Sequence, residues 1–389
     1  MTALSRVALY GLVFTWGCKE ATGPAKSASD STSTSAPVAV PGGLRFSSIS
    51  AGGSHSCGLT GDGTAYCWGH NNAGELGIGA IDTLDHVVPQ AVTGGLKFAV
   101  ISAGYSHTCA VTTGGAAYCW GDNGSGQLGV NSSVLLDPPL ASTVPIPVPG
   151  ALVFTAISAG RTHTCAVTAA GDAQCWGSNQ TGQLGRVPWD WQNIQPPGPV
   201  AGGLAFVSLS ARDVHTCGVT IDGAAYCWGM NASGSLGNGS TASSSTPAAV
   251  VGGLAFTAVS AGLYHTCALT PGGAAYCWGD NEVGALGNGT RDGDWHETPG
   301  PVSGGLNLVA VSAGGSHTCG LTSNGAAYCW GYNQWGQLGD GTSGDSRKPV
   351  PVSGGLTFAA LSAGVAQTCG ITTAGAAYCW GIARPWGQP

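Results

Sequence analysis

Fourteen of the 15 cysteines fall into seven pairs with one spacing, and this regularity limits the folds that the chain can adopt. The members of each pair stand ten positions apart, and the first members recur every 50 to 56 residues. The pairs are Cys57 and Cys67, Cys109 and Cys119, Cys165 and Cys175, Cys217 and Cys227, Cys267 and Cys277, Cys319 and Cys329, and Cys369 and Cys379. A repeat of this length indicates a solenoid, a propeller or an array of similar units, rather than unrelated domains.

Each repeat reads as a set of short β-strands separated by glycine turns. In the fifth copy, strands are expected at Leu254–Ser260, His265–Thr270 and Ala274–Trp278, and a short Pro/Val strand precedes them. Four strands in about 50 residues match a propeller blade, whereas no segment has an apolar period long enough for a helical solenoid. We predict an all-β, seven-bladed propeller of four-stranded antiparallel blades over residues 37–389. The strand at Pro37–Val40 could complete the first or the last blade.

The repeated residues are His-Thr, an apolar residue, Leu-Thr, a glycine turn, Tyr-x-Trp-Gly, Asn and Gly-Gln-Leu-Gly. This pattern resembles the repeat of the regulator of chromosome condensation family, and the resemblance implies a seven-bladed propeller. Family members include exchange factors for a nuclear GTPase, accessory domains of ubiquitin ligases and a secreted bacterial inhibitor of β-lactamases. The resemblance therefore implies a fold rather than one function. We interpret the chain as an exported bacterial, cysteine-rich variant.

The paired cysteines are candidates for disulfides within each blade. They lie symmetrically about a hairpin turn, where facing residues have Cβ atoms roughly 4.5–5.5 Å apart. A disulfide needs roughly 3.5–4.5 Å, so a closely facing, non-hydrogen-bonded pair would serve. Because cysteine occupies both positions in all seven repeats, we predict one disulfide per blade. Buried free thiols and metal ligation are the alternatives, although zinc sites usually have closer cysteine spacing.

The N-terminus resembles an export signal. In residues 1–18, Arg6 precedes an apolar stretch that is too short to span a bilayer, and Gly17 precedes Cys18. Cys18 is a candidate for lipidation, with plain secretion or an uncleaved start as alternatives. Residues 19–36 are rich in Ser and Thr and predict a flexible tether. We expect an outer-membrane or cell-surface lipoprotein, otherwise a secreted or periplasmic protein, and predicted disulfides agree with an oxidising compartment.

One rim of the propeller is predicted to bind a protein. The segments before His-Thr and after Trp-Gly differ between repeats, whereas the hairpin tips at the opposite end are nearly uniform. Aromatic residues and arginine often anchor protein interfaces, and loops on a rigid scaffold commonly carry function. The predicted binding rim contains Tyr105, Arg161, Trp189, Trp191, Asp213, Tyr264, Trp295, Tyr332 and Trp335. The alternative is that these aromatic residues only pack between blades.

Composition and motifs argue against other classes of function. The net charge of −7 gives no basic stripe for nucleic acid. Histidine recurs in six blades, with Gln367 in the seventh, which indicates a structural role rather than catalysis. Arg212-Asp213 departs from the repeat pattern, as does a group that could bind a metal but that we interpret as a solvated loop: Asp292, Asp294, His296 and Glu297.

We therefore expect no enzymatic activity, no cofactor and no metal. The predicted function is a monomeric, protein-binding scaffold whose membrane contact runs only through a lipid anchor at Cys18. One alternative is a proteinaceous enzyme inhibitor that resembles the β-lactamase inhibitor of the same family. A less favoured alternative is a regulator that resembles the guanine-nucleotide exchange factors.

Overall fold

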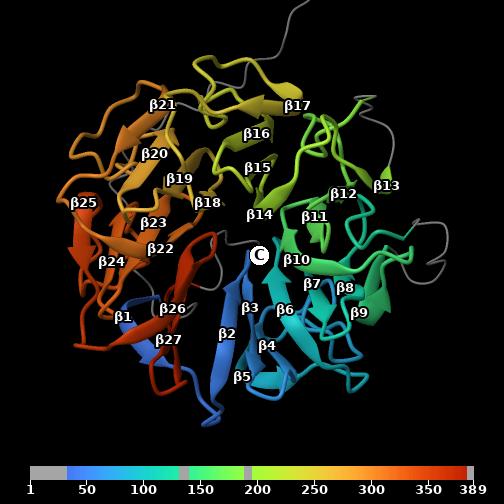
Figure 1. Ribbon diagram of the computed structural model, residues 1–389. Helices are drawn as coiled ribbons and strands as arrows, with labels where there is room; N and C mark the ends of the chain where they lie inside the picture. The colour runs from blue at the N-terminus through green and yellow to red at the C-terminus, as the bar shows by residue number, and fades with distance from the viewer. Residues whose placement is uncertain (1–32, 131–139, 188–194, 383–389) are drawn as a thin grey trace, which may run out of the picture. The chain divides into compact units, whose positions relative to one another are not determined.

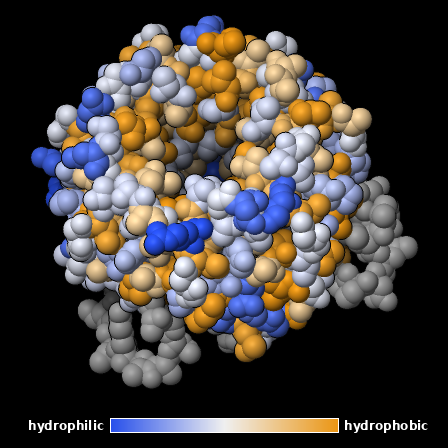
Figure 2. Space-filling view, turned by 60° about the horizontal axis from the view of Figure 1, so that its bottom comes forward, coloured by the Kyte–Doolittle hydropathy of each residue, from blue (hydrophilic) through white to orange (hydrophobic). Residues whose placement is uncertain are grey.

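The computed structural model describes residues 33–130, 140–187 and 195–382. These residues form seven four-stranded antiparallel sheets arranged around a central axis, which confirms the predicted seven-bladed propeller (Figure 1). The ring is hollowed at its centre (Figure 2). Over these ranges, no helix has the length and apolar character needed to cross a bilayer.

Blades 1 to 6 each use four consecutive strands, ordered from the axis outward (Figure 1). Blades 1 to 3 contain β2 (Phe46–Ala51), β3 (His55–Thr60), β4 (Ala65–Gly69), β5 (His86–Ala91), β6 (Phe98–Ala103), β7 (His107–Thr112), β8 (Ala117–Asp122), β9 (Ala141–Pro147), β10 (Phe154–Ala159), β11 (His163–Thr168), β12 (Ala173–Gly177) and β13 (Gln195–Pro199). Blades 4 to 6 contain β14 (Phe206–Arg212), β15 (His215–Thr220), β16 (Ala225–Gly229), β17 (Ser244–Ala249), β18 (Ala258–Ala261), β19 (His265–Leu269), β20 (Ala275–Gly279), β21 (His296–Pro301), β22 (Leu308–Ala313), β23 (His317–Thr322), β24 (Ala327–Gly331) and β25 (Ser346–Pro351).

Blade 7 closes the ring with a strand from the other end of the chain. It combines β26 (Phe358–Ala363), β27 (Gln367–Thr372) and β28 (Ala377–Gly381) with β1 (Thr34–Ala39), which pairs antiparallel to β28. The N-terminal strand therefore completes the last blade, whereas the sequence allowed either the first or the last. This strand covers the edge of β28, which would otherwise be open to pairing with another chain.

The same pairing shows that blades and sequence repeats are offset by one strand. The Pro/Val strand that begins the fifth sequence copy, β17, pairs with β16 of the preceding blade. The N-terminal strand begins at Thr34, so the last residues of the expected 19–36 tether lie in a sheet. The predicted signal at residues 1–18, including Cys18, lies outside the described residues.

The hydrophobic core is divided into layers between neighbouring blades. In the first layer, Leu59 and Leu76 of blade 1 pack with Phe98 and Trp120 of blade 2. Six further clusters repeat this arrangement around the ring. Because each blade buries one apolar face against each neighbour, removal of this surface from water stabilises the ring as a whole.

All seven predicted disulfides form, one in each blade. They join Cys57 to Cys67, Cys109 to Cys119, Cys165 to Cys175, Cys217 to Cys227, Cys267 to Cys277, Cys319 to Cys329, and Cys369 to Cys379. In blade 1 the two cysteines face each other directly across the β3–β4 hairpin, and their Cα atoms are 4.1 Å apart. This short separation is typical of the non-hydrogen-bonded positions of an antiparallel pair. The free-thiol and metal-ligand alternatives are therefore wrong for these fourteen cysteines.

Candidate binding face

A ring of histidine–threonine hydrogen bonds fixes the blades that carry the variable rim. The Nε2 atom of each repeated histidine lies 2.8–2.9 Å from the threonine Oγ1 of the next blade, as in His107 and Thr164. Thr164 Oγ1 in turn donates to the Gln127 carbonyl, which also accepts from Trp176 Nε1. The hydroxyl proton is thus used, so the histidine must donate from Nε2–H.

Burial keeps these histidines neutral. Burial, together with a smaller effect of the neighbouring His55 and His163, lowers the pKa of His107 from 6.5 to about 3. The Nδ1 atom of His107 is buried without a hydrogen-bond partner in the described part of the chain, as expected for a neutral ring that donates only from Nε2. A buried imidazole held in one tautomer between blades supports the structural interpretation of the repeated histidine.

A second ring of hydrogen bonds surrounds the axis. The Ser50 Oγ of β2 accepts from the Ala103 backbone N–H of β6 at 2.9 Å, and the equivalent bond recurs at all seven blade junctions. These bonds place the ends of the inner strands at one mouth of the central channel. The loop residues that follow them are therefore brought together, although they are about 50 positions apart in sequence.

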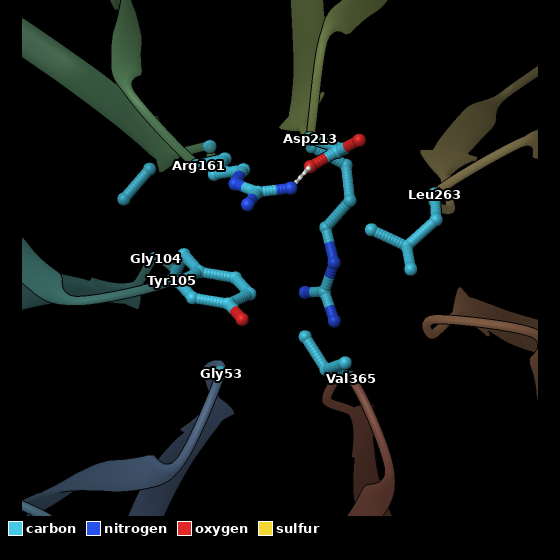
Figure 3. Close-up of a pocket in the computed structure, with 10 residues that line it drawn as sticks. Gly53, Gly104, Tyr105, Arg161, Asp213, Leu263 and Val365 are labelled. Atoms are coloured by element: carbon cyan, nitrogen blue, oxygen red, sulfur yellow. Dashed lines mark hydrogen bonds and ion pairs between the residues drawn. The ribbon is translucent and has the colours of Figure 1, made fainter. Parts of the chain in front are cut away.

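Arg161 and Asp213 form an ion pair at this mouth, which we call the axial mouth (Figure 3). Arg161 Nη1 lies 3.2 Å from Asp213 Oδ1, and its guanidinium carbon lies 4.8 Å from the centre of the Tyr105 ring. Blades 2, 3 and 4 contribute these residues, and Leu263 and Val365 also line this small hollow, whose volume is about 10 Å³. Burial raises the pKa of Asp213, while the charges of Arg161 and Arg212 oppose this shift.

Arg212 crosses the axial mouth from blade 4. Its Nη2 donates to the Ala363 carbonyl of blade 7 at 3.2 Å. Burial lowers the pKa of Arg212 to about 10, and the nearby Asp213 carboxylate opposes the shift. The guanidinium therefore stays charged near neutral pH inside a largely desolvated site.

An aromatic pocket lies beside the axial mouth, between blades 4 and 5. Its volume is about 120 Å³, and its lining includes Met230, Leu263, Tyr264 and Trp295. Tyr264 and Trp295 are 48% and 57% exposed, which is unusual for such large side chains. Leu263 lines both hollows, so the axial mouth and the aromatic pocket form one continuous surface.

The structure brings together five residues of the predicted binding rim. Tyr105, Arg161 and Asp213 meet at the axial mouth, and Tyr264 and Trp295 line the aromatic pocket. Two more, Tyr332 and Trp335, belong to blade 6 and line neither hollow. The remaining two, Trp189 and Trp191, lie outside the described residues.

Two further residues of this surface, Arg212 and Met230, are not among the predicted binding-rim residues. The sequence shows Arg212 as a departure from the repeat, and its replacement of a repeated glycine is the signal that singles it out. Met230 follows a Trp-Gly pair, as variable rim residues do. Neither residue could be assigned to a hollow before the blades were placed around the axis.

The acidic segment of blade 5 contains a histidine–aspartate pair. His296 Nε2 lies 2.9 Å from Asp292 Oδ1, and blade 1 repeats this i,i+4 pair with His86 and Asp82 at 3.1 Å. Within the three described ranges, no group of three or more His, Cys, Asp or Glu residues could hold a metal ion. The repeated histidine–aspartate pair closes a loop in each of these two blades.

Comparisons with known proteins agree with the architecture. The model of the RCC1-like domain matches residues 142–388, and models of the regulator of chromosome condensation (RCC1) repeat match residues 46–75, 98–127, 62–111 and 114–167. The ultraviolet-B receptor UVR8 of Arabidopsis thaliana is 32% identical over 77% of this chain and 68% of its own length. The human E3 ubiquitin-protein ligase HERC2 is 27% identical, but the match spans only 6% of its length.

Solved structures extend the likeness to the fold. Human WBSCR16 has a TM-score of 0.77, with 20% identity over 89% of each chain. Prp20p from Saccharomyces cerevisiae has a TM-score of 0.71, with 21% identity over 87% of this chain and 82% of its own. The study of Prp20p concerns its binding to Gsp1p and histones. At these identities, the likeness concerns the fold alone.

Proposed function

Since the chain belongs to the regulator of chromosome condensation repeat family, we propose that it is an exported, surface-anchored propeller that binds a protein through its variable rim. The observation that carries this proposal is the aromatic pocket beside the Arg161–Asp213 ion pair. Exposed tyrosine and tryptophan next to a half-exposed arginine form the kind of group that dominates binding energy at protein interfaces.

Export is supported by the chemistry of the cysteines. Fourteen cysteines are joined in seven disulfides, and such bonds persist in oxidising compartments. This agrees with the predicted signal at residues 1–18. We propose that lipidation of Cys18 anchors a monomeric propeller to a membrane surface, with the following residues as a spacer.

The binding proposal is tested by measuring affinity for a partner captured from the extracellular side and then purified. We expect the double variant Tyr264→Ala, Trp295→Ala to bind at least about tenfold more weakly, because two exposed aromatic anchors are lost. A matched control is Ile221→Ala, which removes an 81% exposed apolar side chain at the opposite end of blade 4. Unchanged affinity in the double variant would refute the assignment of this pocket.

Cell fractionation tests the anchor separately. The unaltered chain should be found with membranes, and Cys18→Ser should release it as a soluble exported protein. Alkylation of exported protein without reductant, followed by intact mass measurement, should label none of the fourteen paired cysteines. Labelling of those cysteines, or recovery of the chain in the cytoplasm, would contradict the proposed location.

A further inference from the structure

Arg212 occupies a position where the other blades require glycine. The equivalent residues are Gly52, Gly104, Gly160, Gly262, Gly314 and Gly364. A Cβ atom at Gly104 would lie 2.6 Å from the Gly160 carbonyl oxygen and 2.7 Å from His107 Cε1. Such contacts are too short for a real side chain, so the ring normally excludes one here. Blade 4 accommodates Arg212 by extending β14 by one residue, and Arg212 pairs with His215 in the sheet.

This substitution interrupts a third ring of hydrogen bonds around the axis. The residue after each glycine donates its backbone N–H to the next blade, as Gly53 does to Gly104 and Tyr105 does to Gly160, both at 3.0 Å. Among the described residues, the backbone N–H groups of Arg161 and Asp213 do not make this bond. Arg161 belongs to blade 3, the neighbour of blade 4, and Asp213 directly follows Arg212 in the sequence. An arginine that displaces repeated backbone bonds has a local energetic cost, which points to a role outside the scaffold.

The axial mouth holds an excess of positive charge. Arg161 and Arg212 line the hollow together with one carboxylate, Asp213, and that carboxylate is already paired with Arg161. A guanidinium has five N–H donors, yet Arg212 makes one hydrogen bond within the residues described, to the Ala363 carbonyl. Burial lowers the pKa values of His265 and His317 to about 3, with smaller contributions from a neighbouring histidine and from the charge of Arg212, so these rings stay neutral and supply no competing charge.

We propose that the axial mouth binds a carboxylate group, held by the free donors of Arg212 together with Arg161. The guanidinium fork matches the two oxygens of a carboxylate. A single excess positive charge suits a monoanion, which would approach the guanidinium groups from the open side of the mouth, because the hollow itself, at about 10 Å³, has room for no more than a water molecule. The carboxylate could belong to a free small acid or to an acidic side chain of a protein partner. The second source rests on the proposed function, because the axial mouth continues into the aromatic pocket.

The test uses the full oxidised chain and isothermal titration at constant ionic strength. Acetate probes the free acid, and the peptide acetyl-Gly-Asp-Gly-amide probes the side chain, with its Asn counterpart as the neutral control. Tighter binding of the Asp peptide than of acetate would identify a protein carboxylate, and equal binding would identify a small acid. Failure of both probes to bind, or equal binding of the Asn peptide, would overturn the proposal.

Arg212→Gly is the decisive variant, because it restores the residue found in the other six blades. We expect it to fold and to bind carboxylate at least about tenfold more weakly, since charged hydrogen bonds are lost. Arg212→Met tests the same loss with a bulky side chain retained. The control variant Arg347→Ala removes the same charge as the Arg212 variants, but from an exposed arginine of β25, and should bind carboxylate normally. Undiminished binding in both Arg212 variants would refute the site.

The carboxylate titration and the partner-binding measurement can fail independently of each other. Carboxylate binding is measured without a partner, and the variant Tyr264→Ala, Trp295→Ala should leave it intact. A protein whose partner binding survives loss of the aromatic pocket could still bind acetate at Arg212. Conversely, partner binding that depends on the aromatic pocket in a protein that binds no carboxylate would remove only the axial site.

Discussion

Lowering the pH from 7.5 to 5 should strongly destabilise the propeller, because the six histidines between its blades are buried and neutral. Burial lowers their pKa values from 6.5 to about 3, or to about 4 for His215. A protonated ring would carry a second N–H group at Nδ1. This group would have no hydrogen-bond acceptor, because Nδ1 faces the glycine at the end of the inner strand, as His107 faces Gly104. Protonation is therefore favoured only after unfolding.

The size of the effect follows from proton linkage. Each of these histidines binds more protons unfolded than folded below pH 6.5, so its contribution to stability is full above that pH and is lost as the pH falls. Since the folded pKa values lie well below 5, the loss at pH 5 depends only on the ordinary value of 6.5, and is about 2 kcal/mol per histidine. Glu75 has the opposite sign, because burial raises its pKa to about 7, and it offsets the effect of about one histidine.

Urea unfolding of the oxidised protein at pH 7.5 and pH 5 measures this difference. Blade 7 supplies a natural design for the variants, since Gln367 and Ser56 occupy the positions of the histidine and the threonine at its junction with blade 1. Transplanting that contact as His265→Gln with Thr318→Ser should reduce the pH-dependent loss by about 2 kcal/mol. The reverse pair, Gln367→His with Ser56→Thr, should add a seventh histidine and increase the loss by a similar amount.

The reasoning fails if stability is equal at the two pH values. It also fails if nuclear magnetic resonance titration shows the six histidines protonating near 6.5 in the folded protein. A third contradictory result would be an unchanged pH dependence in both paired variants, because the loss would then arise from other groups.

Three further perturbations test the scaffold by urea unfolding. Replacing Cys217 and Cys227 together by Ala should cost about 3 kcal/mol, because the unfolded chain regains the freedom of a loop with a sequence separation of 10, and an unchanged midpoint would contradict this. Gly104→Ala should cost about 1–3 kcal/mol, because its Cβ atom would lie 2.6 Å from the Gly160 carbonyl, whereas Gly272→Ala, with nothing within 4 Å, should be nearly neutral. Trp330→Phe should cost about 1–3 kcal/mol through loss of the 2.9 Å bond to the Ala285 carbonyl, and no loss would disprove that role.

Much of the fold could be predicted because its determinants are local. Cys57 and Cys67 lie symmetrically about one turn, so the hairpin register alone brings them together. The blade boundary was harder, since a strand such as β17 has the same spacing whether it pairs forward or backward along the chain. The identity of the closing strand depended on a pairing between Val38 and Cys379, which no local pattern encodes.

The candidate site was predictable only in part, for a related reason. Variability between repeats identified the rim, but it could not show which variable residues face the same hollow. Tyr264 and Trp295 meet because the loop after β20 returns beside the loop before β19. Arg212 reaches Ala363 across the axis, a contact between blades 4 and 7 that depends on closure of the ring.

Departures from an internal repeat fall into two kinds, and the structure distinguishes them. Ser56 and Gln367 occupy the same junction, where Gln367 Nε2 donates to the His55 carbonyl at 3.0 Å and so keeps an interblade hydrogen bond without the repeated histidine. Arg212 breaks repeated backbone bonds at its two junctions, and the Arg161–Asp213 ion pair restores a contact between blades 3 and 4, but one carboxylate does not neutralise two arginines. The first departure is explained by closure of the ring, whereas the excess positive charge of the second agrees with the proposed carboxylate at the axial mouth.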